Sequence, residues 1–311
     1  MSDYDYLSFT RLFGFLDTFP YSRTVILSIE ATRRSYDGSL FIDRVLKALN
    51  LGQAVHHYPP KNEGALRQLH QHICDANNNI STLHRHSIIY YLYLDIAGRC
   101  GVGASDSAER FAKFANIPER YQTFMRGLWL LDSRSFERAL EHLTHPSLIS
   151  DFADDIVTVL ARSAAKEGDD YTLPLAYYHT VQPSLKSSAA MEALFDAIAR
   201  SSVVAAFEFA RAHADFMRRQ LFQRLVLVVL NSGRGEEAAE RAFELTSLPL
   251  DEDEERWFRE CLESGEAKRL KTAKDTLLMR RIVTGDAVGA GEKGSWATLL
   301  EGFKTGSGGR V

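Results

Sequence analysis

The chain has 311 residues, of which 45% are hydrophobic and 25% are charged, and its formal net charge at pH 7 is -4. This composition is ordinary for a folded globular protein and excludes a chain that is disordered throughout. The small net charge gives no support for nucleic-acid binding through a broadly basic surface, which such proteins usually carry. The length is sufficient for one or two structural units with sizeable cores.

Cysteine usage and hydropathy indicate the compartment. Cys74, Cys100 and Cys261 lie far apart in the sequence and lack metal-ligand spacing, which predicts free thiols in a reducing compartment. The start, MSDYDYLSF, is polar and acidic, unlike a secretory signal peptide. The most apolar run, LVLVVL, is far shorter than the roughly 20 residues that span a bilayer. We therefore expect an intracellular protein with no membrane span.

The N-terminal part predicts short helices separated by polar or proline-containing breaks. Ser39 is expected to cap one helix and Ser81 another, because a serine oxygen accepts hydrogen bonds from free backbone amides. The helix after Ser81 contains SIIYYLYLDIA, which is apolar on nearly all sides and is therefore predicted to be buried. Asp95 lies within it and is expected to bond to the end of a neighbouring helix. Asp106 and Glu109 predict a capping box.

The next passage, GLWLLDSRSFERALEHLTHPSLISDFADDIVTVL, predicts helix, tight turn, helix and then a third helix. Asp132 and Ser133 interrupt the apolar pattern and are expected to cap the second of these helices. The third helix is expected to carry five residues on its apolar face: Ile149, Phe152, Ile156, Val159 and Leu160. Trp129 is predicted to be a structural residue where the first two helices meet.

The C-terminal half repeats this arrangement. Ser187 or Ser188, Asp215 and Asp251 are expected helix starts, Gly233 is an expected helix end, and a further helix is expected over about 266–283. No window shows the sustained alternation of a strand, so we predict an all-α fold. Helix starts recur at uneven intervals without the signature of tetratricopeptide units. The expected architecture is an irregular α-solenoid of stacked antiparallel helical pairs over residues 1–284.

Two clusters could bind metal. Asp151, Asp154 and Asp155 have a spacing that a divalent cation could use in an all-α enzyme. Acids in a first helical turn are also favoured by the helix dipole, and no second acidic cluster accompanies them. Six histidines fall within 31 residues but lack metal-binding spacing. They are His56, His57, His70, His72, His84 and His86. We interpret both clusters as structural or surface residues and predict no catalytic residue, metal or cofactor.

Charge is unevenly distributed near the C-terminus. Residues 236–263 hold eleven acids and three arginines, whereas residues 266–281 hold six bases and two acids. Opposite charges of this kind suit neighbouring helices or a partner. The bases expected to bind an acidic partner are Lys268, Arg269, Lys271 and Lys274.

The last 27 residues, 285–311, form a separate region. Their glycine-rich first part predicts a flexible linker, because few apolar side chains are available to offset the entropy lost on ordering. A helical pattern of apolar residues follows, which is typical of a short helix that lies in a partner's groove. Its members are Trp296, Leu299, Leu300 and Phe303. The alternative is that this helix packs on its own chain.

Three segments together resemble a known family. SIIYYLYLDIAG, FAKFANIPERY and GLWLLDSRSFERALEHLTHPSL occur in this order, and they resemble the ELYS-type helical domain of nuclear pore assembly proteins. The resemblance covers roughly residues 25–250, and the length is similar to that of short fungal members. It implies an all-helical, non-enzymatic protein.

The resemblance also implies partners and a location. The expected role is that of a structural nucleoporin at the nuclear pore complex in the nuclear envelope. Its expected partners are the long helical nucleoporin of the Y-complex short arm and the small WD-repeat propeller nucleoporin. The β-propeller and DNA-binding region of long animal members have no counterpart in this sequence, so nucleic-acid binding is not expected. An all-α metal-dependent enzyme and a helical adaptor of another complex are the alternatives.

Overall fold

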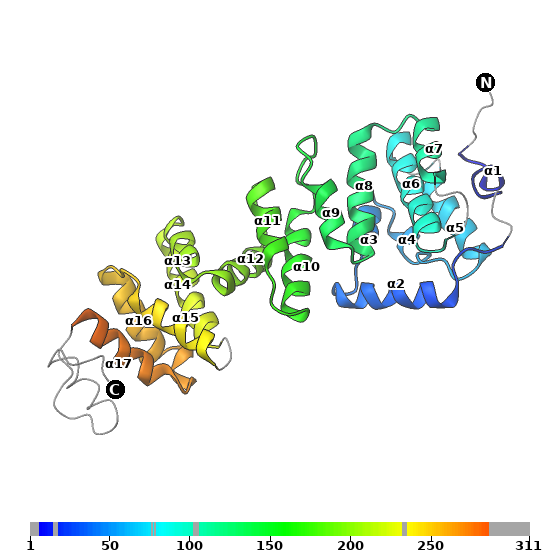
Figure 1. Cartoon of the computed structure of the whole chain (residues 1–311). Helices are drawn as coiled ribbons and strands as arrows, with labels where there is room; N and C mark the ends of the chain where they lie inside the picture. Colours follow the sequence, from blue (N-terminus) through cyan, green and yellow to red (C-terminus); the bar gives the residue numbers. More distant parts are fainter. Residues whose placement is uncertain are drawn as a thin grey trace. The chain divides into compact units, whose positions relative to one another are not determined.

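Helices form all the regular structure in the part of the chain that the computed structural model describes (Figure 1). This confirms the predicted all-α fold class. The described residues are 6–14, 18–75, 77, 79–101, 106–231 and 235–285. The chain divides into two compact units, Met1–Ala153 with Ala176–Ser184, and Asp154–Leu175 with Leu185–Val311. In the described residues, no helix is both long enough and apolar enough to cross a bilayer.

The helices that lie wholly in the first unit precede residue 144. They are α1 Phe9–Phe13, α2 Arg23–Ser35, α3 Phe41–Ala48, α4 Gly52–Val55, α5 Glu63–Cys74, α6 Thr82–Gly98, α7 Ser107–Phe114, α8 Glu119–Asp132 and α9 Phe136–Leu143. The boundary between the units falls at the start of α10 and within α11. The remaining elements are α10 Ala153–Lys166, α11 Thr172–Val181, α12 Ser188–Ser201, α13 Val203–Arg211, α14 Asp215–Leu230, α15 Glu236–Ser247, α16 Glu252–Glu263, the 3-10 helix η1 Glu266–Arg269 and α17 Ala273–Thr284.

Most of the predicted helix starts are confirmed. The hydroxyls of Ser81 and Ser187 each accept a hydrogen bond from the amide three residues later, at 3.2 and 3.1 Å. Asp251 caps α16 in a capping box. Two of the expected caps that are wrong precede α3 and α7. Helix α3 begins after Leu40 rather than Ser39, and the side chain of Asp106 makes no capping hydrogen bond to α7.

Helix α6 lies at the centre of the first unit, beside α5, α7 and α8 (Figure 1). Every residue of α6 from Ser87 to Ile96 is buried, as its uniformly apolar sequence predicts. Helices α8 and α9 pack closely as a hairpin, because Gly127 allows Leu143 to approach the α8 backbone. A β-carbon at Gly127 would lie 2.6 Å from the Leu143 side chain.

Asp95 is fully buried in α6, as predicted, but its partners are side chains rather than a helix end. It accepts hydrogen bonds from the Tyr58 hydroxyl at 2.9 Å and the Trp129 indole N–H at 3.1 Å. Arg99 forms an ion pair with it at 3.2 Å. The Trp129 ring lies against Gly98, where a β-carbon would come within 2.5 Å of it. The half-buried Trp129 therefore joins α6 to α8, rather than lying at the predicted junction of α8 and α9.

Asp132 has a different role from the predicted one. It ends α8, and its carboxylate accepts hydrogen bonds from the backbone amides of Phe41 and Ile42 at 2.8 and 3.0 Å. The hydroxyl of Tyr91 donates a third hydrogen bond at 2.8 Å. Asp132 therefore satisfies the free amides at the start of α3, far away in sequence, instead of capping α9.

The predicted third helix is confirmed for Ile156, Val159 and Leu160, which are buried in α10, but the prediction is wrong for Ile149 and Phe152. Helix α10 begins at Ala153, and Phe152 has a φ angle of +58°, which an α-helix cannot contain. The Ile149 side chain is 76% exposed rather than packed on a helix face. Pro146 is nearby in this irregular segment, and its ring restricts the preceding residue to non-helical angles.

The predicted C-terminal helix over about 266–283 is divided into two elements. The 3-10 helix η1 is separated from α17 by a short turn at residues 271–272. Helix α14 starts at Asp215, as predicted, and ends at Leu230. The predicted stop at Gly233 lies outside the described residues. Helices α13, α14 and α16 pack around buried apolar side chains that include Phe222 and Phe258.

Candidate partner-binding surface

Asp154, one of the three acids considered as metal ligands, makes a structural contact. The Asp154 carboxylate accepts hydrogen bonds from the backbone amides of Lys186 and Ser187 at 3.0 and 2.9 Å, just before α12. Asp154 therefore stabilises the backbone just before the first residue of α12. Within the described ranges, no three His, Cys, Asp or Glu side chains are grouped as ligands of a metal ion.

The histidines considered with them contact different parts of the first unit. His57 and His72 stack with ring centroids 5.0 Å apart. His70 is buried, with its Nε2 atom 2.9 Å from the Tyr6 carbonyl oxygen. His86 makes an edge contact with the Phe111 ring. These contacts are aromatic packing and backbone hydrogen bonds.

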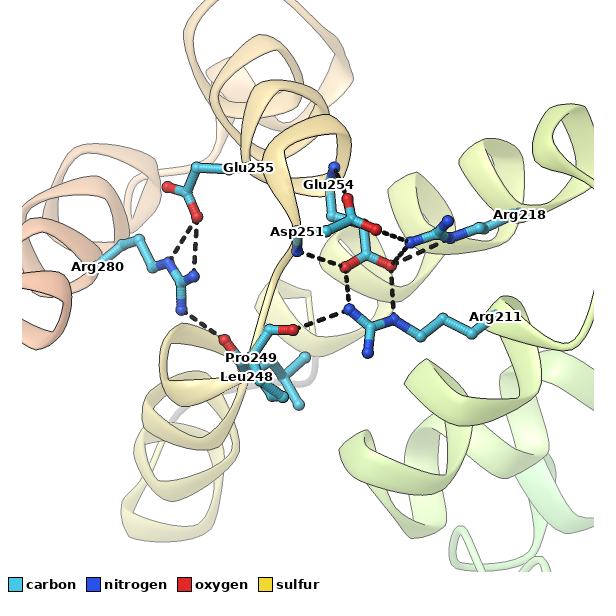
Figure 2. Close-up of polar contacts among 8 residues, drawn as sticks. All are labelled: Arg211, Arg218, Leu248, Pro249, Asp251, Glu254, Glu255 and Arg280. Carbon is cyan, nitrogen blue, oxygen red and sulfur yellow. Dashed lines mark hydrogen bonds and ion pairs between the residues drawn. The ribbon is translucent and has the colours of Figure 1, made fainter.

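A cluster of charged side chains joins α13, α14 and α16 in the second unit (Figure 2). The Glu254 side chain is 1% exposed and lies between two arginines. The Nε atoms of Arg211 and Arg218 donate to its carboxylate at 2.9 and 3.1 Å. The backbone amide of Asp251 donates to it at 3.0 Å, completing the capping box of α16. Arg218 also pairs with the Asp251 carboxylate.

The environment of Glu254 favours its ionised form. Burial by itself would raise its pKa. The hydrogen bonds from Arg211, Arg218 and the Asp251 amide outweigh burial, so the pKa of Glu254 lies below its ordinary value of 4.5. The carboxylate is therefore charged at neutral pH and holds three helices together.

Arg280 anchors α17 to the same region (Figure 2). Its guanidinium is buried and donates to the carbonyl oxygens of Thr246 and Leu248, both at 2.7 Å. Its Nε and a terminal nitrogen donate to Glu255 at 3.0 and 2.8 Å. These bonds tie α17 to the end of α15 and the start of α16. The hydrogen bonds of Arg280 thus hold the C-terminal end of the basic stretch, residues 266–281, in place.

These contacts identify the ion-pair partners of several acids in residues 236–263. Acids of residues 236–263 pair with arginines that come earlier in the chain, as Glu254 does with Arg211 and Arg218 and as Glu260 does with Arg219 at 2.9 Å. Arg280 is the base of residues 266–281 for which an ion pair with this acidic stretch is described, and its partner there is Glu255.

The basic surface consists of the four bases that the sequence analysis selected: Lys268, Arg269, Lys271 and Lys274. All four are exposed, on η1, the following turn and the first residues of α17. None forms an ion pair or a side-chain hydrogen bond with any residue in the described part of the chain. Four unneutralised cations close together in sequence form a surface suited to an acidic partner.

A groove in the second unit was not predicted. It has a volume of about 660 Å³ and is lined in part by Met191, Met217 and Leu227, with Gly265 and Glu266 at the start of η1. The same 3-10 helix carries Lys268 and Arg269, so the groove adjoins the basic surface. The sequence signal for it is Met217, an apolar residue in the first turn of α14 that lines the groove.

The apolar residues selected in the C-terminal region, Trp296, Leu299, Leu300 and Phe303, lie outside the described residues. Gly285 is the last residue described, and its φ angle of +74° closes α17 in the left-handed conformation that suits glycine.

Comparison with known proteins gives independent support for the family resemblance seen in the sequence. The sequence matches the ELYS family, whose description is nuclear pore complex assembly, over residues 39–265. It is also similar to the uncharacterized protein ely5 of Schizosaccharomyces pombe, with 26% identity over 257 residues that cover 82% of this chain and 79% of that protein. The family match covers most of the chain and includes helices of both units. The chain therefore belongs to the ELYS family of nuclear pore complex assembly proteins.

Proposed function

We propose that this protein is a non-enzymatic structural nucleoporin that docks on the short arm of the Y complex at the nuclear envelope. Its partners would be the long helical nucleoporin of that arm and the small WD-repeat propeller nucleoporin. Membership of a pore-assembly family supports this role. We further propose that its helices stack as an irregular α-solenoid, an architecture that presents extended surfaces to protein partners.

The observation that carries the docking proposal is the basic surface. The arginines around Glu254 are neutralised within the second unit, whereas Lys268, Arg269, Lys271 and Lys274 are exposed without a described partner. Unpaired exposed cations raise the rate at which an acidic partner associates, and salt screens them over about 10 Å at 0.1 M. We propose that an acidic segment of the short arm binds there.

Replacing these four bases by glutamate is expected to slow association with the reconstituted short arm by about tenfold or more at low salt. The dependence of the association rate on salt should flatten, because attraction between the surfaces is lost. Thermal stability should hardly change, since all four side chains are exposed. Stopped-flow or surface-binding kinetics across a salt series measures the first two effects, and calorimetry measures the third.

A matched control carries the same change in net charge elsewhere. It replaces four exposed bases that also have no described ion pair: Arg23, Lys61, Lys113 and Lys166. Its association rate should stay within about twofold of the unaltered chain. Equal slowing in both variants would show that only total charge matters and would remove the basic surface as a docking site.

The groove supplies an apolar component to the same proposal. An amphipathic helix with acidic residues on one side would place its apolar residues against Met191, Met217 and Leu227 and its acids near the bases of η1. Met217→Asp tests this contact, because an acid in the first turn of α14 is tolerated by the helix dipole. Unchanged dissociation of this variant from the short arm would exclude the groove from the interface.

The C-terminal region is proposed to bind the partner as well. Removal of residues 286–311 leaves Gly285 to close α17 and is expected to leave the melting temperature nearly unchanged. Capture of the short arm should weaken, because the apolar residues Trp296, Leu299, Leu300 and Phe303 would be lost. A peptide of residues 293–305 should bind the short arm directly in a fluorescence anisotropy assay.

The control is the same peptide with Trp296 and Phe303 replaced by serine, which should not bind. A lower melting temperature after truncation, together with exchange-protected amides at residues 296–303 in the isolated protein, would instead show that this segment packs on its own chain.

A further inference from the structure

Three threonines in this chain follow an arginine at a spacing of three residues: Thr123, Thr272 and Thr284. Protein kinases that prefer basic substrates select hydroxyl side chains by nearby positive charge, and an arginine three residues earlier is typical of their sites. Sequence spacing alone does not distinguish the three positions. Their structural surroundings do.

Two of these threonines are poorly placed for modification. Thr123 is half-buried inside α8, within a continuous helical hydrogen-bond pattern. Thr284 lies in the last turn of α17, and its hydroxyl donates to the carbonyl oxygen of Arg280 at 3.0 Å. A kinase would have to unwind α8 to reach the Thr123 hydroxyl, and modification of Thr284 would break the hydrogen bond of its hydroxyl to Arg280.

Thr272 has different surroundings. It is exposed and lies in the short turn between η1 and α17. It occupies the N-cap position of α17, but its side chain makes no capping hydrogen bond. Its backbone oxygen is the group that accepts hydrogen bonds, from the amide and hydroxyl of Thr276 at 2.9 and 2.8 Å. The hydroxyl therefore has no bond to a described residue that modification would break.

The charge around Thr272 is also distinctive. Arg269 stands three residues before it and Lys271 one residue before it, while Lys268 and Lys274 lie four residues before and two after. These are the four bases of the basic surface, all exposed. Thr272 is thus at the centre of the surface that we propose for docking.

We propose that Thr272 is a phosphorylation site for a basophilic protein kinase and that phosphorylation weakens docking at the basic surface. The kinase would transfer the γ-phosphoryl group of ATP to the Thr272 Oγ1 atom. An O–P bond forms there, the bond between the β- and γ-phosphates breaks, ADP leaves and the hydroxyl proton passes to the catalytic base of the kinase.

The consequence follows from charge. A phosphate adds about -1.5 to -2 charge at pH 7 in the middle of four cations and so cancels up to half of their charge. Its oxygens can also accept hydrogen bonds from lysine and arginine side chains that would otherwise meet the partner. Folding should be little affected, because Thr272 and the four bases are exposed. This consequence rests on the proposed docking function, whereas the modification itself does not.

The first experiment measures the modification alone. The full-length chain is incubated with ATP and a kinase of the protein kinase A class, and phosphate is located by mass spectrometry. We expect modification chiefly at Thr272, and incorporation into Thr272→Ala should fall by about tenfold, because the other two sites are held in helices. Thr123→Ala and Thr284→Ala are the matched controls and should incorporate as much as the unaltered chain. Unchanged incorporation into Thr272→Ala, or phosphate located mainly at Thr123 or Thr284, would overturn the assignment.

The second experiment measures the effect on docking. Thr272→Glu should associate with the reconstituted short arm about threefold to tenfold more slowly at low salt, with a smaller difference at high salt. Thr272→Val has a similar shape without charge and should associate normally. Equal rates for the two variants would refute the regulatory effect. Failure of the unmodified chain to bind the short arm would instead refute the proposed function and leave the mass-spectrometric result standing.

Discussion

Glu254→Gln is expected to lower the free energy of unfolding of the second unit by about 3–5 kcal/mol, because it removes one partner from a buried ion cluster. The glutamine keeps the size of the side chain but replaces a carboxylate oxygen with an amide group. That amide would face the N–H groups of Arg211 and Arg218, which donate to Glu254 in the native protein. Two guanidinium groups would lose a charged acceptor. Hydrogen exchange followed by mass spectrometry would measure the effect in α13, α14 and α16 separately from the first unit.

Asp253→Asn provides the matched control. Asp253 precedes Glu254 in the same first turn of α16, but its side chain is 58% exposed and pairs with Arg256 three residues later. Exposed pairs of this kind contribute little, so the expected change is below about 0.5 kcal/mol. Similar losses in the two variants would mean that charge at the start of α16, rather than the buried cluster, stabilises this unit.

The same cluster predicts a dependence on pH. Because the folded-state pKa of Glu254 is lowered, its stabilising contribution is present above its ordinary value of 4.5 and is lost as pH falls through the lower folded-state value. The second unit of the unaltered chain should therefore become less stable on acidification below about pH 4.5. Glu254→Gln should lack this part of the acid sensitivity in the exchange measurement.

Asp132→Ala is expected to destabilise the first unit by about 3–5 kcal/mol, because three buried donors would lose their acceptor at once. The donors are the amides of Phe41 and Ile42 and the hydroxyl of Tyr91. Protection from exchange should fall first in α3. The control is Asp151→Ala, which changes an exposed aspartate of the same unit and should cost less than about 0.5 kcal/mol.

Asp132 should give the opposite pH dependence to Glu254. Burial raises its pKa to about 6, although the hydrogen bonds from the Phe41 and Ile42 amides and the Tyr91 hydroxyl oppose the rise. The folded state then binds a proton more tightly than the unfolded state, so this contribution to stability decreases as pH rises from about 4 to about 6. Asp132→Asn cannot titrate. The stability difference between the unaltered chain and Asp132→Asn should therefore be about 2–3 kcal/mol larger at pH 4 than at pH 7. A difference that does not vary with pH would contradict this assignment.

The sequence by itself determined the local elements of this protein. Ser81, Ser187 and Asp251 were predicted as helix caps and are observed as caps, because a cap joins a side chain to an amide only three residues away. The uniformly apolar α6 was predicted to be buried for a similar reason, since its composition leaves no face suited to water. The three segments within α6–α9 were also sufficient to identify the family.

Only the tertiary structure decided which polar groups meet across the chain. Asp132 was expected to cap the helix that follows it, but it bonds to amides at the start of α3 instead. Asp95 was expected to bond to the end of a neighbouring helix, but it bonds to the side chains of Tyr58 and Trp129. Such partners depend on which helices pack together, and the helical pattern of a single segment carries no information about its neighbour.

The same distinction applies to the candidate surface. The sequence showed the contrast in charge between residues 236–263 and 266–281, and it identified Lys268, Arg269, Lys271 and Lys274 as exposed bases. It did not show that Arg211 and Arg218 would form ion pairs with Glu254, the buried acid of α16. Helix packing decides which opposite charges lie within a few ångströms of each other. Burial then strengthens the attraction between them, because it excludes water. Glu254 takes its partners from α13 and α14, and Lys268, Arg269, Lys271 and Lys274 are exposed.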